Sequence, residues 1–433
     1  MTTHDTALAV SDDEAAAITR AIDRDELVKL VLDLCGIPSP MRQERRAGEF
    51  VHGWMAENGF APRKAGLMEH RFNVIGTYGG KGDGPNLLFT SHLDTESPFY
   101  DETDQYTYRP ETVADPQWLG VWLEGETFFG HAVGNDRGPM ACFLMAAKAL
   151  KKAGIDLSGL MYLTACPGEI GPEPAEERGG VDYLGKELGA CYLMSHGGVA
   201  PDYVISAEGT DFGVNWTACG YADFRVTIYG QGVFTPLLTH PEALADHPSP
   251  LVKVAPAIEI IQRWAREYEV KHRYEGPGGT AVPKVQIGAI RGGTPQAMGA
   301  ASEVCNVYVQ VALTPVQTIA AVDRDLKRAF REAGFGDVKI QPYTVRHGFT
   351  ADPDAVRPLR MALDHAHGRV RGGPQPISNS VYSSMWRDHN VFNMNRIPSV
   401  TMGPRRWRPS IDDLVDCTRL YAMAALALCG RAP

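Results

Sequence analysis

Residues 86–94 read NLLFTSHLD, an apolar run that passes directly into a histidine and an aspartate. A short apolar stretch bounded by polar residues is typical of a buried strand. Similar runs occupy residues 73–76, 160–164 and 203–206, and a helical pattern covers residues 138–152. Strands that alternate with helices predict an α/β layer, in which polar groups at the strand ends converge on one edge of the sheet.

The pattern changes in the middle of the chain. Residues 223–229, DFRVTIY, alternate apolar and polar with a period of two, and a long helical stretch covers residues 251–268. Helices mixed with alternating strands are typical of a small α+β unit. We therefore expect a catalytic α/β domain formed by residues 1–216 and 344–433, with residues 217–343 inserted as an α+β lid or dimerisation domain.

The composition restricts the class of partner. The 433 residues include 42 lysines and arginines against 52 aspartates and glutamates, a net charge of −10 that disfavours nucleic acid. The sequence predicts neither a membrane-spanning segment nor a signal peptide. Its eight cysteines are scattered without CxxC pairs, which favours free thiols. We expect a cytoplasmic protein that acts on a small molecule, without a nucleic-acid or membrane partner.

Several polar side chains follow the predicted strands or a glycine-rich turn. They are His92, Asp94, Asn135, Asp136, Glu169 and Glu208. Each offers a nitrogen or oxygen atom suited to Zn²⁺ or Mn²⁺. Taken singly, each also has an ordinary structural explanation, as a turn residue, a helix N-cap or a solvated loop residue. Their order along the chain is the stronger signal.

Five segments resemble the ordered signatures of the M20 metallopeptidases, which include aminoacylases, carboxypeptidases and related amidohydrolases. They are FTSHLDT (89–95), GHAVGNDRGPMA (130–141), CPGEIG (166–171), ISAEGT (205–210) and RIPSVTMGP (396–404). The resemblance covers nearly the whole chain. It implies a mixed-sheet, metallopeptidase-type α/β catalytic domain, an inserted lid or dimerisation domain, and a homodimer or higher homo-oligomer.

The resemblance also implies roles for individual residues. His92 matches the family's first metal-ligating histidine, and Asp94 matches the carboxylate that orients this ligand. Glu208 matches a carboxylate ligand of the same metal. Glu169 falls at the second position of the family's Glu-Glu pair, which normally binds the other metal.

Three positions depart from the family pattern. Asn135 stands where an aspartate normally bridges two metals, Gly168 stands at the general base, and Pro409 lies near the expected C-terminal histidine. The second metal has thereby lost its bridge and its histidine. We therefore expect one divalent ion per active site, either Mn²⁺, Zn²⁺ or Co²⁺.

With the ligands of the second metal missing, few residues remain as candidate metal ligands and general base. His92, Glu208 and either Asn135 or Asp136 are expected to hold the ion. Glu169, released from the second metal, becomes the expected general base for an activated water.

A basic and aromatic cluster, formed by Arg405, Arg406 and Trp407 together with Trp386, is the predicted substrate-binding group. Arginine forks suit a carboxylate and indoles stack on planar rings, although a solvated basic loop would have the same composition. The preferred hypothesis is hydrolytic deamination of an aromatic amino acid such as 5-nitroanthranilate, as in the family's offshoot of 5-nitroanthranilic acid aminohydrolases. The alternatives are an aminoacylase or dipeptidase/carboxypeptidase, and a non-catalytic ligand-binding relative.

Overall fold

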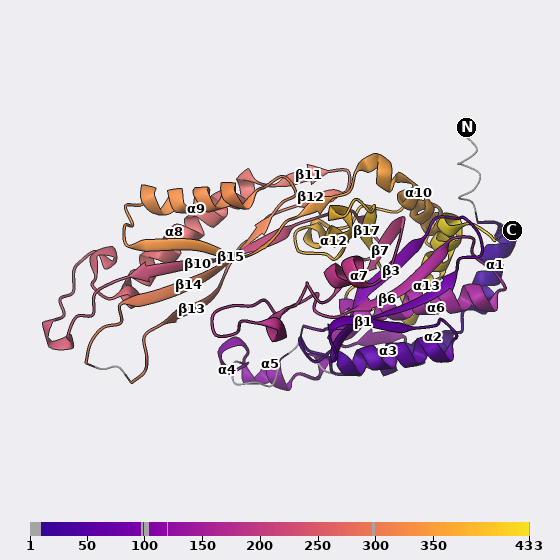
Figure 1. Ribbon diagram of the computed structural model, residues 1–433, viewed down its shortest axis with the longest axis horizontal. Helices are drawn as coiled ribbons and strands as arrows, with labels where there is room; N and C mark the ends of the chain where they lie inside the picture. The colour runs from indigo at the N-terminus through magenta and orange to yellow at the C-terminus, as the bar shows by residue number, and fades with distance from the viewer. Residues whose placement is uncertain (1–9, 97, 99–103, 119, 297–298, 433) are drawn as a thin grey trace. The chain divides into compact units, whose positions relative to one another are not determined.

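The computed structural model describes residues 10–96, 98, 104–118, 120–296 and 299–432. The chain divides into two compact units (Figure 1). Unit 1 comprises Met1–Trp216, Ala351–Asn379 and Arg387–Pro433, and unit 2 comprises Thr217–Thr350 and Ser380–Trp386. Residues 344–350 and 380–386, which the sequence analysis placed in the catalytic domain, thus belong to unit 2.

Among the described residues, a mixed sheet of seven strands forms the centre of unit 1. Its strands are, in spatial order, β1 (Arg63–Met68), β2 (Arg71–Gly79), β6 (Leu160–Cys166), β3 (Leu87–His92), β7 (Tyr203–Ala207), β17 (Ser399–Met402) and β8 (Val214–Asn215). β6, β3, β7 and β17 run parallel, while β1, β2 and β8 pair antiparallel with their neighbours. Phe89 pairs with Leu163 on one side and Ile205 on the other. The predicted mixed α/β fold class is confirmed.

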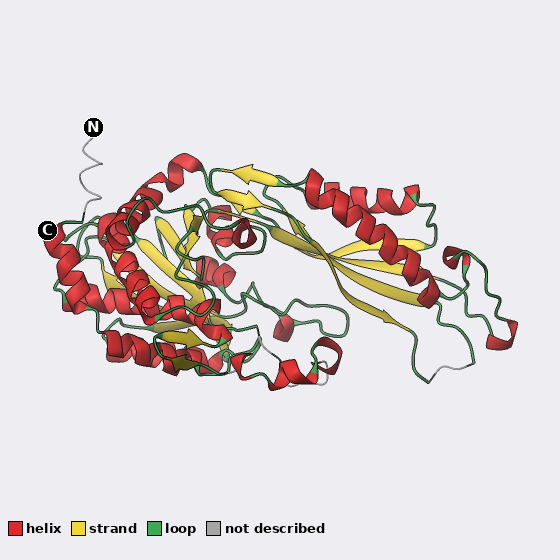
Figure 2. Ribbon diagram, turned by 180° about the vertical axis from the view of Figure 1, so that it is seen from behind, coloured by secondary structure: helices red, strands yellow, loops and turns green. Residues whose placement is uncertain are grey.

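Helices lie on both faces of this sheet (Figure 2). They are α1 (Asp12–Ala21), α2 (Arg24–Cys35), α3 (Arg45–Glu57), α6 (Gly138–Lys152), α7 (Ala190–His196), α10 (Pro353–Val370), α12 (His389–Met394) and α13 (Ile411–Cys429). The shorter α4 (Asp104–Thr107) and α5 (Pro110–Ala114) lie in the segment between β3 and Trp122. α6 and α13 are buried almost all round, because they pack against each other and against β3. A capping box formed by Ser11 and Glu14 opens α1.

Between β3 and Gly130, the described residues include α4, α5 and the hairpin of β4 (Trp122–Glu124) and β5 (Thr127–Phe129). Trp122 stacks on Phe129 across the hairpin, with ring centroids 5.5 Å apart.

In unit 2, the described residues form an antiparallel sheet of four strands. The elements of this unit are β13 (Val285–Gly292), β14 (Val304–Leu313), β10 (Gly220–Tyr229), β15 (Val338–Arg346), α8 (Pro250–Lys271) and α9 (Ile319–Glu332), with the smaller β9 (Thr217–Ala218), β16 (Phe349–Thr350), β11 (Tyr274–Gly276), β12 (Gly279–Ala281) and α11 (Ser380–Ser383). The core of unit 2 joins the sheet to both long helices through Phe224, Ile261, Val309 and Leu326.

Two further predictions concern membrane-spanning helices and the cysteines. Within the described ranges, no helix is both long and apolar enough to cross a membrane. All eight cysteines lie in these ranges and are free thiols; seven are buried and Cys191 is half-buried.

A buried ion pair fixes the segment that follows β6. Arg71, at the start of β2, forms a two-point contact with Glu44, with one Nη2–Oε1 distance of 2.6 Å and both side chains at most 1% exposed. The same guanidinium also donates to the backbone carbonyls of Gly171 and Leu184. Arg71 therefore holds both ends of the loop between these residues.

We predict that Glu44→Gln lowers the free energy of unfolding by about 3 kcal/mol, because it leaves the Arg71 charge buried and uncompensated. Urea denaturation measures this loss. Glu49→Gln is the matched control, since Glu49 makes an exposed pair with Lys64, and should cost less than about 1 kcal/mol. Equal losses in the two variants would contradict the assigned role of the buried pair.

Candidate active site

The carboxyl ends of the parallel strands bring the predicted residues to one edge of the unit 1 sheet. His92 is the last residue of β3, and Glu208 follows β7 directly. Glu169 lies three residues beyond the end of β6. Since β6, β3 and β7 are adjacent and parallel, their following residues meet at this edge.

His92 is held from two sides. Its Nε2 lies 2.8 Å from Oδ2 of Asp136, and its Nδ1 lies 2.7 Å from the backbone carbonyl oxygen of Asp94. The Asp94 carboxylate is farther from Nδ1, at 3.6 Å, and instead accepts the backbone N–H groups of Glu169 and Ile170. The expected orienting contact to His92 thus comes from the Asp94 backbone, while its side chain positions the segment that carries Glu169.

Carboxylates surround the His92 ring. Burial lowers the pKa of His92, but the hydrogen bond to Asp136 and the negative charges of Asp136, Glu169 and Asp94 outweigh burial and raise it to about 10. Oε2 of Glu169 lies 3.8 Å from Nε2 of His92. Three carboxylates close to one imidazole create a field that favours a cation.

The structure distinguishes between Asn135 and Asp136. The Asn135 amide donates to Nε2 of His131 at 2.9 Å, whereas the Asp136 carboxylate points at His92. The Asp136 carboxylate is fully buried, and a second bond, from the backbone N–H of Gly209, reaches it at 3.3 Å. Burial favours the neutral acid, but His92 and the nearby arginines hold the pKa of Asp136 below its usual range.

Backbone contacts around the site require glycine at two positions. A Cβ on Gly134 would lie 1.7 Å from the backbone carbonyl oxygen of Arg406, so this turn packs directly on the segment after β17. Gly168 has φ +74°, and a Cβ there would lie 2.4 Å from the carbonyl oxygen of Gly185. The position expected to carry the family's general base therefore has no room for a glutamate side chain.

Glu208 is turned to an arginine. Its Oε1 accepts from the hydroxyl of Ser206 at 3.2 Å and its Oε2 accepts from Nη1 of Arg387. Glu208 is 1% exposed and Arg387 3%. Burial, followed by the charge of Arg406, lowers the pKa of Arg387 to about 10, so the guanidinium remains charged at neutral pH.

The four predicted ligands do not form one group. Of these ligands, His92 and Asp136 are in contact, whereas Asn135 and Glu208 face other partners. No set of three or more His, Cys, Asp or Glu side chains in the described ranges is arranged to hold a metal ion. The imidazole and carboxylate of the contacting pair are nonetheless donors that suit a single divalent ion.

The basic cluster divides in the structure. Nη1 of Arg406 lies 3.8 Å from Oδ1 of Asp136, so this arginine reaches the site. Arg405 is exposed and points to Asp413, and Trp407 is 64% exposed. Trp386 belongs to unit 2, where its ring meets Tyr221 edge-on at 6.3 Å. Arg406 is thus the member of this cluster that is seen beside a predicted metal ligand among the described residues.

The predicted set omitted three polar residues near the site. Arg387 binds Glu208, His131 binds Asn135, and the ammonium group of Lys186 donates to the backbone carbonyl of Glu169. Burial and the Arg406 charge lower the pKa of His131 to about 4, which keeps the ring neutral. The run WRDHN (386–390), at the start of α12, was a signal for Arg387, since buried charged residues seldom lack partners.

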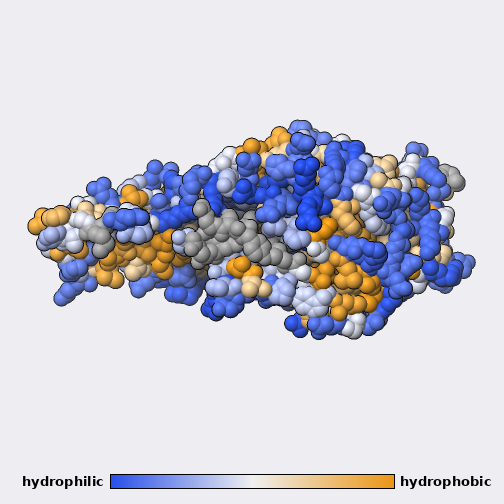
Figure 3. All heavy atoms as spheres, turned by 90° about the horizontal axis from the view of Figure 1, so that it is seen from below, coloured by the Kyte–Doolittle hydropathy of each residue, from blue (hydrophilic) through white to orange (hydrophobic). Residues whose placement is uncertain are grey.

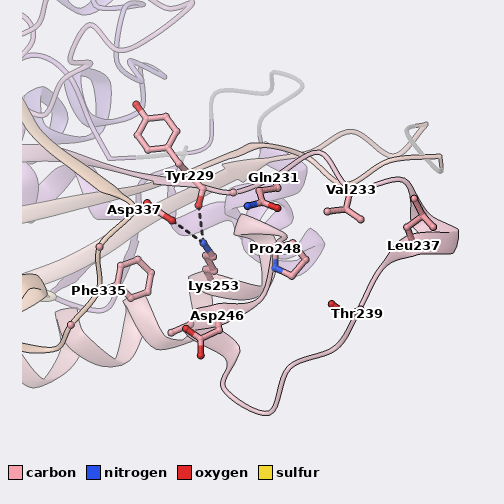
Figure 4. A pocket seen from close by; sticks show the side chains of 14 residues that line it. Tyr229, Gln231, Val233, Leu237, Thr239, Asp246, Pro248, Lys253, Phe335 and Asp337 are labelled. Atoms are coloured by element: carbon pink, nitrogen blue, oxygen red, sulfur yellow. Dashed lines mark hydrogen bonds and ion pairs between the residues drawn. The ribbon is translucent and has the colours of Figure 1, made fainter.

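A pocket of about 690 Å³ lies within unit 2, near the end of β10 and the start of α8 (Figure 4). Nζ of Lys253 lies 3.3 Å from the carbonyl oxygen of Tyr229 and 3.4 Å from Oδ2 of Asp337. None of the residues singled out by the sequence motifs lines it. The strand-end cluster of unit 1 is therefore the candidate active site.

Solved structures share the fold over almost the whole chain. An aminopeptidase from Bacillus cereus aligns with a TM-score of 0.64 at 15% identity, covering 95% of this chain and 100% of that one. A dinuclear metal-binding M20 peptidase from Bacillus subtilis aligns at 0.57 and 15%, covering 94% and 98%. The chain has the M20 metallopeptidase fold. The family resemblance seen in the five motifs is confirmed at this level.

The curated sequence relatives match either a part of the chain or nearly all of it at low identity. No family model matches it. A putative LysW-lysine/LysW-ornithine hydrolase from Pyrococcus abyssi is 27% identical over 46% of this chain and 44% of its own length. The N-formyl-4-amino-5-aminomethyl-2-methylpyrimidine deformylase of Bacillus subtilis is 22% identical over 94% and 96%. The chain spans less than half of the first curated relatives that it matches.

We predict that Asp136→Asn abolishes binding of Mn²⁺, whereas Asn135→Ala leaves it nearly unchanged. Only the Asp136 side chain faces His92, and an amide is a poorer ligand for a hard cation than a carboxylate. Isothermal titration of both purified variants with Mn²⁺ measures the affinities. Loss of binding in Asn135→Ala with retention in Asp136→Asn would reverse the assignment.

Proposed function

We propose that this chain is a metal-dependent hydrolase that cleaves an amide carbon–nitrogen bond in a small, carboxylate-bearing substrate. The observation that carries the proposal is the group of His92, Asp136 and Glu169 at the carboxyl edge of parallel strands, with Arg406 beside it. The relatives named above hydrolyse carbon–nitrogen bonds, in agreement with the enzyme class predicted from the sequence.

His92 and Asp136 are the residues that would hold a divalent ion, because their donor atoms already face each other. When bound, such an ion supplies Lewis-acid activation of water and stabilisation of negative charge on the substrate. Asp94 keeps the His92 ring in place through its backbone carbonyl. Two protein ligands make a weak site, so we expect chelators to remove the ion readily.

Glu169 is the proposed general base. Its side chain is 11% exposed, whereas Asp136 and Glu208 are 0% and 1% exposed. Its backbone is fixed by Asp94 and Lys186, so the carboxylate is the accessible member of a rigid group. A carboxylate in this place can take a proton from water and pass it to the leaving nitrogen.

Arg406 is the proposed anchor for a substrate carboxylate. Its guanidinium is mostly buried beside Asp136, and it lies 5.9 Å from the Trp407 ring. A guanidinium fork binds a carboxylate in a fixed orientation, which is how a site positions the bond to be cut. Trp407 is exposed and offers an apolar surface next to this anchor.

The choice of an amide rests on the relatives. Peptidases and a deformylase share the fold or the sequence, and none of the proteins named here acts on an aromatic amine. The finer hypothesis of 5-nitroanthranilate deamination therefore has less support than its aminoacylase or dipeptidase/carboxypeptidase alternative. Deamination of 5-nitroanthranilate is therefore the reaction to compare with amide cleavage.

We also propose a homo-oligomer whose contact surface lies on unit 2. Large apolar side chains are exposed on this unit, among them Phe234, Leu237, Leu244 and Ile290, and the space-filling view shows apolar residues on its surface (Figure 3). Exposed apolar patches often mark protein contacts. Eight free thiols agree with a reducing compartment such as the cytoplasm.

The reaction class is tested with a substrate panel at saturating Mn²⁺, Zn²⁺ or Co²⁺. We expect turnover of N-acyl amino acids or dipeptides, loss of turnover with EDTA, and recovery on adding metal. Analogues that carry a carboxamide in place of the carboxylate should react poorly, because they cannot pair with Arg406. Ammonia released from 5-nitroanthranilate, without amide cleavage, would replace this proposal by arylamine hydrolysis.

Glu169→Gln should lower kcat by about 10²–10⁴-fold, the usual scale for losing a general base. The substitution keeps the size and hydrogen-bonding capacity of the side chain, so metal content should stay near that of the wild type. Elemental analysis of the dialysed variant checks this point. A variant that loses its metal would identify Glu169 as a ligand instead.

A further inference from the structure

We infer that the substrate of this site carries a planar aromatic ring, which stacks on Trp407 beside His131. The inference rests on the proposed amide hydrolase and narrows its substrates to amides of aromatic amino acids, in which the carboxylate and the ring belong to the same residue. It starts from three side chains of unit 1, Trp118, His131 and Trp407, which we call the aromatic row. His131 lies next to both tryptophans, and Trp407 lies next to Arg406.

The aromatic row is joined to the candidate active site at two points. The amide of Asn135, the residue directly before Asp136, donates to Nε2 of His131 at 2.9 Å. Trp407 directly follows Arg406, whose Nη1 lies 3.8 Å from Oδ1 of Asp136. A group bound on the aromatic row is therefore held close to the carboxylate that is the proposed metal ligand.

The His131 ring in this row has a fixed position. Its side chain is 6% exposed, and the nitrogen that accepts from Asn135 does so in the plane of the ring, which leaves the ring faces for stacking. Trp118 makes one such contact, with ring centroids 4.8 Å apart and ring planes tilted by 46°. Tilted pairs at this separation are favourable. His131 is therefore held in place before any ligand binds.

Trp407 is the open end of the aromatic row. It is 64% exposed, although a tryptophan ring has more apolar surface to bury than almost any other side chain. The His131 ring lies 6.2 Å from the Trp407 ring, centroid to centroid, and the Arg406 guanidinium lies 5.9 Å from it. These neighbours leave most of the indole uncovered, so a flat group can lie on it.

Other aromatic rings of unit 1 close to this row in sequence are already covered. Trp122 stacks on Phe129, with ring centroids 5.5 Å apart and ring planes within 13° of each other. The Arg408 guanidinium lies 4.9 Å from the Phe129 ring, and Nε1 of Trp122 donates to Glu124 at 2.8 Å. The exposure of Trp407 is thus a particular feature of this residue, and Trp122 provides a matched comparison.

The charge beside Trp407 defines the rest of the ligand. Arg406 is the proposed anchor for a substrate carboxylate, and its guanidinium adjoins the Trp407 ring. An amino acid with an aromatic side chain has both groups on one residue and can use both contacts at once. A saturated ring of similar size would bury a similar area but could not stack flat on the indole. The preferred substrates are therefore N-acyl derivatives of phenylalanine, tyrosine or tryptophan.

The test compares 3-phenylpropanoate with 3-cyclohexylpropanoate, two acids that share a carboxylate and a chain length and differ in the planarity of the ring. Isothermal titration of the full-length, Mn²⁺-loaded protein should show about fivefold tighter binding of the aromatic acid, the scale expected for one stacked pair. Trp407→Leu should remove this difference, because leucine has an apolar surface but no ring. Trp407→Phe keeps a ring and should retain the preference for the aromatic acid.

Trp122→Leu is the matched control. It removes a tryptophan from the same unit, but one whose ring is already stacked on Phe129, so both acids should bind as they do to the wild type. Equal affinities of the two acids for the wild-type protein would overturn the inference. An unchanged preference in Trp407→Leu, or its loss in Trp122→Leu alone, would also overturn it.

These outcomes are separable from those of the proposed function, because neither acid contains an amide bond. A protein that prefers the aromatic acid through Trp407 but cleaves no N-acyl amino acid would refute the reaction and leave the stacking role intact. An active amidase that binds both acids equally would do the reverse.

Discussion

This site depends on one constraint: each buried charge needs a partner of opposite charge beside it. Asp136, Glu208 and Arg387 are almost completely removed from water, and each would be costly to bury alone. Their positions are therefore mutually determined: Asp136 faces His92 and Arg406, and Glu208 faces Arg387. The strands do more than present ligands, because their parallel order brings opposite charges to the same edge.

Close backbone packing holds the residues of these ion pairs in fixed positions. Gly134 lets the turn that carries Asp136 lie directly on the backbone of Arg406, and Gly168 lets the chain after β6 turn back against Gly185. Arg71 holds the loop after Glu169 by donating to the backbone carbonyls of Gly171 and Leu184, and it also forms an ion pair with Glu44. A carboxylate in such a frame has little freedom to move, which lowers the cost of ordering the site when a substrate binds.

Much of this could be predicted from the sequence, because the decisive signals are local. The apolar runs that lead to His92 and Glu208 become β3 and β7. The choice between Asn135 and Asp136 could not be made, because neighbouring residues in a tight turn point in different directions and only backbone angles decide which one faces His92. The sequence showed Arg387 but not its partner, since Glu208 lies 179 residues away along the chain.

A guanidinium and a metal ion are not equivalent at the same carboxylate. Both neutralise Glu208, but the arginine donates hydrogen bonds, keeps its position without an external supply, and cannot activate water as a Lewis acid. The proposed activation of water belongs on the His92 side of Asp136, where Oε2 of Glu169 lies 3.8 Å from Nε2 of His92. The proposed base and the proposed ion site are thus on the same side for an electrostatic reason. The arginine side is left to hold negative charge, either of Glu208 or, through Arg406, of a substrate carboxylate.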